Sequence, residues 1–157
     1  MAKVYLCEDE SGNQVAVKWL ESDHKPWVRR FLREGECLAS VQHRHIVKYI
    51  GSGMWENRPY LVLNYINGWN LKTYAEKLHQ RPPLERYTKC RQIAVEISHA
   101  LHALHVMGII HRDVKPTNIL IGDSGRSFLT DFGTIKEQDN TEKTVTGVMV
   151  GTPTYAA

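Results

Sequence analysis

The chain of 157 residues is 42% hydrophobic and 24% charged, and it carries a formal net charge of +3. This composition is ordinary for one globular domain, and so mild a charge, without a block of like charges, gives no indication of a nucleic-acid partner or an anionic membrane. The N-terminus lacks the apolar core of a signal peptide, and no apolar run approaches the roughly 20 residues that cross a bilayer. We therefore expect a cytoplasmic protein with no nucleic-acid partner and no membrane segment in this chain.

The first part of the chain predicts a small strand-rich unit with one helix. Strands are predicted from Val4 to Cys7, from Gln14 to Leu20, from Ile46 to Gly51 and from Pro59 to Ile66. The polar segment E-D-E-S-G-N joins the first two strands as a hairpin, and the segments G-S-G and E-N-R separate the last two. Between the two pairs, apolar residues recur every three to four positions from Pro26 to Val41, which predicts an amphipathic helix.

Near residue 67 the pattern changes from strands to helices. Helices are predicted from Leu71 to Leu78 and from Leu84 to Met107, where Gly108 ends the longer one. The longer helix carries an apolar stripe formed by Ile93, Ile97, Leu101 and Leu104. A short hairpin with strands Ile119 to Ile121 and Ser127 to Thr130 follows, and then a Thr-rich tail. We expect an α+β fold with a hinge near residue 67 between a small β lobe and a helical lobe.

The cysteines and histidines do not favour a disulfide framework or a zinc site. The three cysteines are far apart and form no C-x-x-C pair: Cys7, Cys37 and Cys90. Three histidines follow one another at intervals of three on the longer helix: His99, His102 and His105. Because each interval turns the side chain by about 60° around a helix, the three do not converge well on one ion. We interpret these residues as reduced thiols and as surface or packed histidines.

The segment H-R-D-V-K-P-T-N, His111 to Asn118, gathers five kinds of polar group in eight residues. Its proline disfavours a helix, so the segment should be a loop. Asn118 and Asp131 flank the short hairpin that follows, and we expect them to face the same point in space. An amide and a carboxylate oxygen are ligands that Mg²⁺ accepts beside phosphate oxygens and water. Asp113 could then accept a proton from a nucleophile, and Lys115 could neutralise charge developing on the phosphate.

Four motifs occur in a specific order along the chain. They are V-A-V-K at Val15 to Lys18, the loop octapeptide, D-F-G at Asp131 to Gly133, and G-T-P-T-Y at Gly151 to Tyr155. Each alone is weak evidence, since D-F-G is a common turn and V-A-V-K is a strand that ends in a lysine. Together they resemble the eukaryotic-type (Hanks-type) serine/threonine protein kinase family, with a leaning toward its bacterial members. The resemblance covers nearly the whole chain.

The resemblance implies a protein-kinase-like two-lobe fold that transfers the γ-phosphoryl group of ATP to Ser or Thr hydroxyls of protein substrates, with Mg²⁺. Residues 1–66 would form the N-terminal β lobe with one helix, and residues 67–157 the first part of the helical C-terminal lobe, through the catalytic and activation loops. A noncatalytic pseudokinase-like or remnant nucleotide- or protein-binding module is the alternative reading. A small-molecule phosphotransferase is a third, although D-F-G and G-T-P-T-Y favour a protein substrate.

Residue roles follow from the resemblance position by position. Lys18 would reach the α- and β-phosphates of ATP, and Glu34 would hold this lysine in an ion pair. Glu36 is the competing partner, but Glu34 lies three residues after Phe31 and four before Leu38, on the apolar side of the predicted helix. Asp113 would be the catalytic base, Lys115 would mark the serine/threonine branch, and Asn118 and Asp131 would bind Mg²⁺.

The adenine pocket and the activation segment are also implied by the resemblance. The pocket residues would be Val4, Ala16 and Leu120 as apolar walls, Leu63 at its back, and the backbone of Asn64 and Ile66 as hydrogen-bonding groups. Thr144 and Thr146 resemble activation-loop phosphorylation sites, and a phosphate there would pair with Arg112. An unmodified flexible loop is the alternative. Thr152 would lie in the segment that meets the protein substrate.

The motif pattern is incomplete at both ends of the sequence. The family's Gly-rich loop should precede Val4, and G-T-P-T-Y-A-A stops where the family continues with A-P-E. We therefore expect residues 1–157 to be a partial kinase domain, with weak or no activity in isolation. Without the rest of the helical lobe, the apolar side of the helix from Leu84 to Met107 and the I-L-I strand should face water unless a partner covers them.

Overall fold

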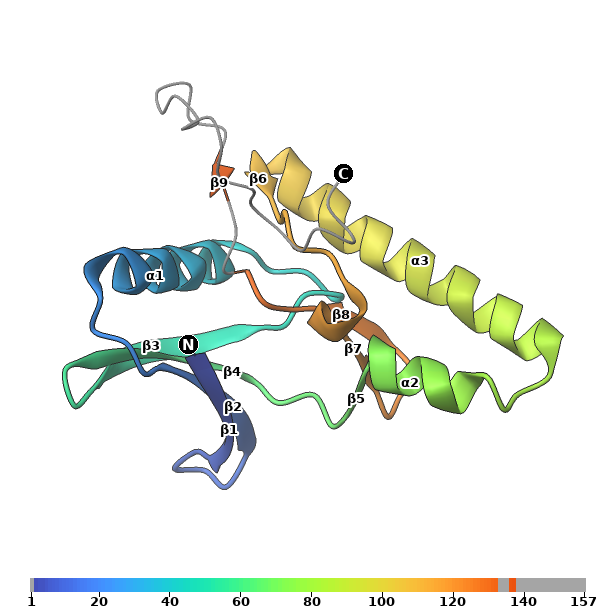
Figure 1. The fold of residues 1–157 in the computed structure, drawn as a ribbon, viewed down its shortest axis with the longest axis horizontal. Coiled ribbons are helices and arrows are strands. Elements are labelled where there is room, and N and C mark those ends of the chain that lie inside the picture. Colours follow the sequence, from blue (N-terminus) through green and yellow to red (C-terminus); the bar gives the residue numbers. More distant parts are fainter. Residues whose placement is uncertain (1, 133–135, 138–157) are drawn as a thin grey trace. The chain divides into compact units, whose positions relative to one another are not determined.

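The computed structural model describes residues 2–132 and 136–137, and the chain divides into two compact units. The first unit consists of Met1–Gln42 and Val47–Ile66, and the second of His43–Ile46 and Asn67–Ala157. The chain thus enters the second unit for four residues between two segments of the first. The units combine antiparallel sheets with helices (Figure 1), so the predicted α+β class is confirmed.

The first unit is a four-stranded antiparallel sheet that packs against one helix. Its strands, in spatial order, are β1 (Ala2–Glu8), β2 (Gln14–Leu20), β4 (Arg58–Asn64) and β3 (Tyr49–Trp55). Helix α1 (Lys25–Ser40) lies along this sheet (Figure 1) and buries Phe31, Gly35 and Leu38. Burial alternates along β4, where Leu61 and Leu63 are buried and their neighbours are not, because successive side chains of a strand point to opposite faces. The predicted hairpin and helix are confirmed.

The predicted strand from Ile46 to Gly51 is confirmed only in part: G-S-G does not end the strand, whereas the predicted separating segment E-N-R does contain the turn. Strand β3 continues through both glycines to Trp55, and the turn is formed by Glu56 and Asn57, whose φ angles are 50° and 59°. Two consecutive left-handed residues are what a tight two-residue hairpin turn requires. Gly53 has a packing role instead, because a methyl group at this position would overlap the ring of Tyr60, its cross-strand neighbour.

The second unit contains two helices and two small sheets. One sheet has the order β5 (Gly68–Asn70), β7 (Ile119–Gly122) and β8 (Ser127–Leu129), and the other pairs β6 (Ile109–Ile110) with β9 (Lys136–Glu137). The helices are α2 (Leu71–Leu78) and α3 (Pro83–Val106). The predicted helices and the β7–β8 hairpin are confirmed, whereas β5, β6 and β9 were not predicted. Asn70 caps the N-terminus of α2, since its side chain accepts a hydrogen bond of 3.0 Å from the backbone N–H of Thr73.

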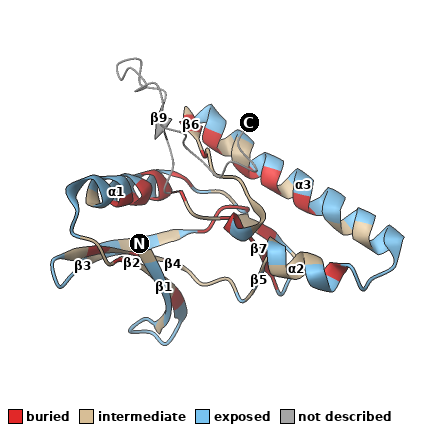
Figure 2. Cartoon of the chain, viewed as in Figure 1, coloured by how far each residue is buried: buried red, intermediate tan, exposed pale blue. Residues whose placement is uncertain are grey.

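The apolar stripe of α3 faces the interior of the second unit (Figure 2), where α3 packs on β6 and β8. Its buried residues are Ile93, Ile97, Ala100 and Leu104. The expectation that this stripe and the I-L-I strand face water was therefore wrong: Ile119 and Ile121 are buried and Leu120 is half-buried. The described elements of this unit suffice to cover them, although Leu84, Tyr87 and Val106 on other sides of the helix are exposed. None of the described helices is both long and apolar enough to cross a membrane.

Gly68 allows β5 to approach β7 closely. A Cβ atom at this position would overlap the backbone carbonyl group of Ile121. Backbone cannot move aside as a flexible side chain does, so we expect Gly68→Ala to lower the free energy of unfolding by about 1–3 kcal/mol. Urea unfolding measures this change. Gly51→Ala is the matched control, since a methyl group at Gly51 meets no atom within 4 Å; an equal loss in both variants would contradict the packing explanation.

Candidate functional site

A buried ion pair joins β2 to α1 in the first unit. Nζ of Lys18 lies 2.6 Å from Oε1 of Glu34, and the two side chains are 12% and 3% exposed. The competing Glu36 is exposed. The difference follows from the helix period, because Glu34 shares the face of α1 that packs against the sheet with Phe31 and Leu38. The structure thus pairs the lysine with the glutamate that the sequence analysis preferred.

Several predicted adenine-contacting residues share one face of the same sheet. Val4 is the register partner of Lys18, and Ala16 is the partner of Leu63. Since Ala16 and Lys18 are two positions apart on β2, all four side chains lie on the same face. Leu63 is buried and Val4 is 64% exposed. The sheet therefore presents the ammonium group and three apolar side chains on one face.

Asn64 ends β4, and its polar groups contact Lys48. Its backbone N–H donates to the carbonyl of Lys48 over 2.9 Å, and its side-chain oxygen accepts from the N–H of Lys48. Any backbone contact from Asn64 to a ligand would therefore use its carbonyl oxygen. Ile66 is half-buried. It lies two residues after the end of β4 and is the last residue of the first unit.

A second cluster is formed by the loop between β6 and β7 in the second unit. Nζ of Lys115 lies 2.7 Å from Oδ2 of Asp113, and Nδ2 of Asn118 lies 3.0 Å from the same oxygen. Nδ2 of Asn118 also donates to the backbone carbonyl of Asp113 over 2.9 Å. A 3₁₀ turn at Pro116–Asn118 closes the loop. The local chain thus directs a cation and an amide toward one carboxylate, which is 12% exposed.

His111 organises this loop, a role that the sequence analysis did not assign. The side chain is buried, and its Nε2 lies 3.1 Å from the carbonyl oxygen of Thr130. Since a carbonyl oxygen only accepts, Nε2 carries the proton and Nδ1 can accept the N–H of Asp113 over 3.3 Å. Burial lowers the pKa of His111, and this effect outweighs its hydrogen bond to Thr130, so the ring is neutral at neutral pH. The imidazole therefore ties the loop to the end of β8.

Asn118 and Asp131 lie at the two ends of the β7–β8 hairpin. The backbone N–H of Thr130 donates to the carbonyl of Asn118 over 3.0 Å, which brings the two ends together. Asp131 has a φ of 68°, and Arg112 in the loop has a φ of 62°. A left-handed conformation costs a residue with a side chain about 1 kcal/mol or more, and such strain is concentrated at functional sites. Both strained residues thus lie within the predicted site.

The donor atoms at the end of the hairpin fit a hard divalent cation. Asn118 contributes an amide oxygen, since its Nδ2 is used by Asp113, and Asp131 contributes a carboxylate. Mg²⁺ accepts such oxygen ligands and takes only one or two of them from the protein when phosphates supply others. Among the described residues there is no group of three or more His, Cys, Asp or Glu side chains that could hold a metal ion.

Of the remaining predicted site residues, the structure describes some and not others. Leu120 lies on β7 and is half-buried, and Arg112 is half-buried in the loop. Gly133, Thr144, Thr146 and Thr152 lie outside the described residues. A carboxylate held by a lysine and an amide, beside a pair of oxygen ligands, is suited to deprotonating a hydroxyl group next to a metal-bound phosphate.

Comparison with known proteins agrees with this chemistry. The whole chain, residues 1–157, matches the family model described as "Protein kinase domain". It is 36% identical over 99% of its length to a probable serine/threonine-protein kinase, PknB, of Lactococcus lactis, and 36% identical over 99% to the serine/threonine-protein kinase PrkC of Bacillus subtilis. It is 37% identical over 98% to the serine/threonine-protein kinase PknK of Mycobacterium tuberculosis. The chain covers 25%, 24% and 14% of these relatives, a quarter of their length or less.

Proposed function

Because this chain belongs to the protein kinase family, we propose that the gene product containing it transfers the γ-phosphoryl group of ATP to Ser or Thr hydroxyls of protein substrates. The observation that carries this proposal is the Asp113 carboxylate, held by Lys115 and Asn118. Phosphoryl transfer needs little covalent chemistry from the protein, and positioned charges supply most of the catalysis. The family implies ATP and, typically, Mg²⁺.

Asp113 would accept the proton of the attacking hydroxyl at its carboxylate. Its contacts to the Lys115 ammonium and the Asn118 amide orient the carboxylate before the substrate binds, so no reorganisation is needed during the reaction. The Lys115 ammonium is also close enough to the base to neutralise charge on a phosphoryl group transferred there. A lysine at this position is the feature that favours Ser and Thr over Tyr as acceptors.

Lys18 would bind the α- and β-phosphates, with Glu34 holding its ammonium group in position. Asn118 and Asp131 would hold Mg²⁺, which when bound neutralises charge on the phosphates. The apolar side chains of Val4, Ala16, Leu63 and Leu120, together with the backbone of Asn64 and Ile66, would bind the adenine. These roles rest on the family resemblance and on the residue positions given above.

A direct assay tests the proposed function. The protein is expressed from its complete reading frame and incubated with γ-labelled ATP and a basic protein substrate, with and without Mg²⁺. We expect label on Ser and Thr of the substrate only when Mg²⁺ is present. Nucleotide binding without transfer would favour a pseudokinase, and transfer to small molecules alone would favour a small-molecule phosphotransferase.

We also propose that residues 1–157 form only part of a kinase domain. Residues 1–66 would be the N-terminal lobe and 67–157 the start of the C-terminal lobe, and residues 1–157 contain no G-x-G-x-x-G motif that could cover the phosphates. The isolated 157-residue chain should therefore transfer phosphate weakly or not at all when assayed beside the complete gene product. Equal rates for the two proteins would contradict this proposal.

Regulation by phosphorylation is a further part of the proposal. A phosphate on Thr144 or Thr146 would pair with Arg112 and order the segment that includes Thr152. Replacing both threonines by Ala should lower the activity of the complete gene product, and Arg112→Gln should lower it to the same extent. A variant that combines all three substitutions should be no less active than either one. A double-Ala variant with an unchanged rate would exclude the switch.

A further inference from the structure

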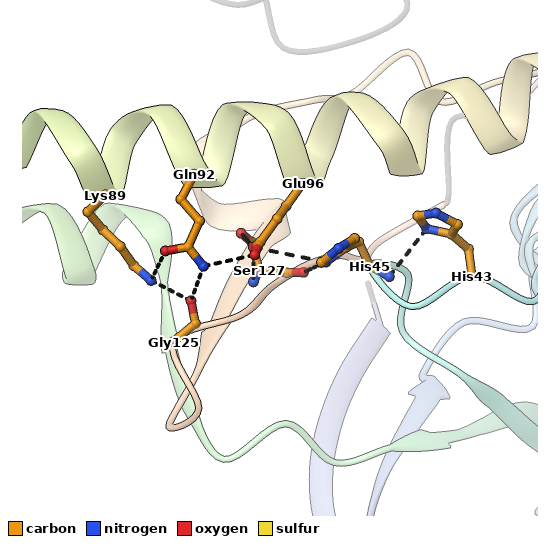
Figure 3. A network of polar contacts seen from close by, with 7 residues as sticks. All are labelled: His43, His45, Lys89, Gln92, Glu96, Gly125 and Ser127. Carbon is orange, nitrogen blue, oxygen red and sulfur yellow. Dashed lines mark hydrogen bonds and ion pairs between the residues drawn. The ribbon is translucent and has the colours of Figure 1, made fainter.

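Ser127 is the first residue of β8, and the structure pairs all of its polar groups although it is fully buried. Its backbone N–H donates to Oε2 of Glu96 over 2.7 Å, and its hydroxyl donates to the same oxygen. Its carbonyl oxygen accepts from Nδ1 of His45 over 3.0 Å. Figure 3 shows Glu96 extending from α3 toward Ser127, with His45 next to both residues; Nδ1 of His45 lies 3.9 Å from Oε2 of Glu96. Two residues distant in the chain therefore hold the start of β8.

These contacts lie on the strand at the edge of the sheet. β8 is the last strand in the order β5-β7-β8, and an edge strand has backbone groups without a neighbouring strand. The N–H of Leu129 donates to the carbonyl of His45 over 2.8 Å, and Ile46 forms a parallel bridge with Leu129. The carboxylate of Glu96 and the segment 43–46 thus take the place of a further strand beside β8.

The same face of α3 also holds the turn of the hairpin. Nε2 of Gln92 donates to Oε1 of Glu96 over 2.8 Å, and Nζ of Lys89 donates to Oε1 of Gln92 over 3.0 Å. Lys89 also donates to the carbonyl of Gly125 in the turn between β7 and β8 (Figure 3). Lys89 therefore holds the turn before β8, and Glu96 holds the first residue of the strand.

Glu96 is a strong acceptor because it is ionised. Burial of the carboxyl group, which is 13% exposed, acts to raise its pKa, but hydrogen bonds from Ser127 and Gln92 outweigh burial and hold the pKa below its usual value. Hydrogen bonds to an ionised acceptor are roughly twice as strong as those between neutral groups. Removing this acceptor would leave a buried N–H and a buried hydroxyl without a partner, and this cost favours a displacement of β8.

We propose that Glu96 is a positioning residue for the metal-binding end of the β7–β8 hairpin, acting through Ser127 and β8 on Asp131. Asp131 follows Ser127 by four residues, and Thr130 between them is bound on both sides, by Asn118 and by His111. A displacement of β8 would therefore be passed through Thr130 to Asp131, and also to Asn118, whose carbonyl oxygen accepts from Thr130 at the same end of the hairpin. Metal sites tolerate displacements of only about 0.5 Å. This inference rests on the proposed function, in which Asn118 and Asp131 bind Mg²⁺.

The experiment measures metal affinity without catalysis. Mn²⁺ is titrated by electron paramagnetic resonance into the protein from its complete reading frame, in the presence of a non-hydrolysable ATP analogue. Glu96→Met removes the acceptor at similar length and should weaken Mn²⁺ binding by a few-fold, less than the roughly 10- to 100-fold lost with a partner that contacts a metal ligand directly. Glu96→Gln should restore most of the affinity, because one amide oxygen can accept both hydrogen bonds that Oε2 accepts.

Lys89→Met is the matched control. It removes a contact from the same helix to the same hairpin, but at the turn, and should leave the Mn²⁺ affinity unchanged even if thermal stability falls. If Glu96→Met does not fold, Ser127→Ala replaces it: this variant keeps the backbone hydrogen bond to Glu96 and should weaken Mn²⁺ binding to a smaller extent.

Three results would overturn the proposal. A folded Glu96→Met variant, or in its place Ser127→Ala, with wild-type Mn²⁺ affinity would leave Glu96 a structural role only. An equal loss in Lys89→Met would indicate general loosening of the hairpin. Wild-type protein that binds no Mn²⁺ would refute the metal site itself, and with it the proposed function. If the wild-type protein binds Mn²⁺ and transfers phosphate, and the variants bind Mn²⁺ equally well, only the role of Glu96 is refuted. Failure of this inference can therefore be distinguished from failure of the proposed function.

Discussion

Replacing Asp113 by Asn should lower the kcat of protein phosphorylation by about 10²–10⁴-fold, the usual contribution of a positioned general base. The amide keeps the shape of the carboxylate and can still accept from Lys115 and Asn118, which contact Oδ2 at 2.7 and 3.0 Å. It cannot take the proton of a hydroxyl group. The KM for ATP should therefore change little, and steady-state kinetics of the complete gene product separate the two constants.

Asp123→Asn is the control for this variant. Asp123 lies in the turn of the β7–β8 hairpin, is exposed, and contacts the side chain of Asn67. The same chemical change there should leave kcat unchanged. A kcat of the Asp113→Asn variant within a fewfold of wild type would show that the hydroxyl proton is lost by another route, and Asp113 would then be an orienting residue.

Replacing Glu34 by Gln should destabilise the first unit by about 3–5 kcal/mol, because it removes the charge that Glu34 places beside the buried ammonium of Lys18. The two groups are 2.6 Å apart and almost fully buried, so water cannot replace the lost charge well. The KM for ATP should rise as well, since Lys18 would no longer be held toward the phosphates. Urea unfolding followed by tryptophan fluorescence gives the first quantity, and initial rates at varied ATP give the second.

Glu36→Gln supplies a control two residues away on the same helix. Glu36 is exposed, and a surface substitution usually changes stability by less than about 0.5 kcal/mol. Combining Glu34→Gln with Lys18→Met should cost less than the sum of the two single changes, because residues that contact each other are energetically coupled. Equal effects of Glu34→Gln and Glu36→Gln would refute the assignment of the ion pair.

Much of the fold could be predicted because local sequence patterns determine where most helices and strands form. Apolar residues at helical spacing place α1 and α3, and the alternation and turn residues place β1 with β2 and β7 with β8. The same helix period separates Glu34 from Glu36, since only the former shares the buried face of α1. Short motifs likewise locate the loop around Asp113, because its function requires particular groups within a few residues.

Other features depend on contacts between distant residues, which leave no periodic signal. Strands of two or three residues, such as β5 and β6, are too short to show alternation. The glycines of β3 suggested a break in the strand, but Gly53 instead makes room for the aromatic ring of Tyr60 on the neighbouring strand, and the turn falls on Glu56 and Asn57, within the segment E-N-R that the sequence also indicated. Glycines in a short segment do not show whether they form a turn or make room for a bulky side chain on another strand.

The sequence alone therefore determines which groups of the loop around Asp113 lie together. Which distant residues hold the neighbouring strand β8 in place depends on the tertiary structure. Asp113, Lys115 and Asn118 are close in the chain, so the loop itself brings them together. Glu96 and Ser127 are 31 residues apart, and His45 and Ser127 are 82 apart. In sequence, Glu96 resembles any solvated glutamate on a helix. Only folding places it against the edge of β8, where a buried N–H and hydroxyl require an acceptor.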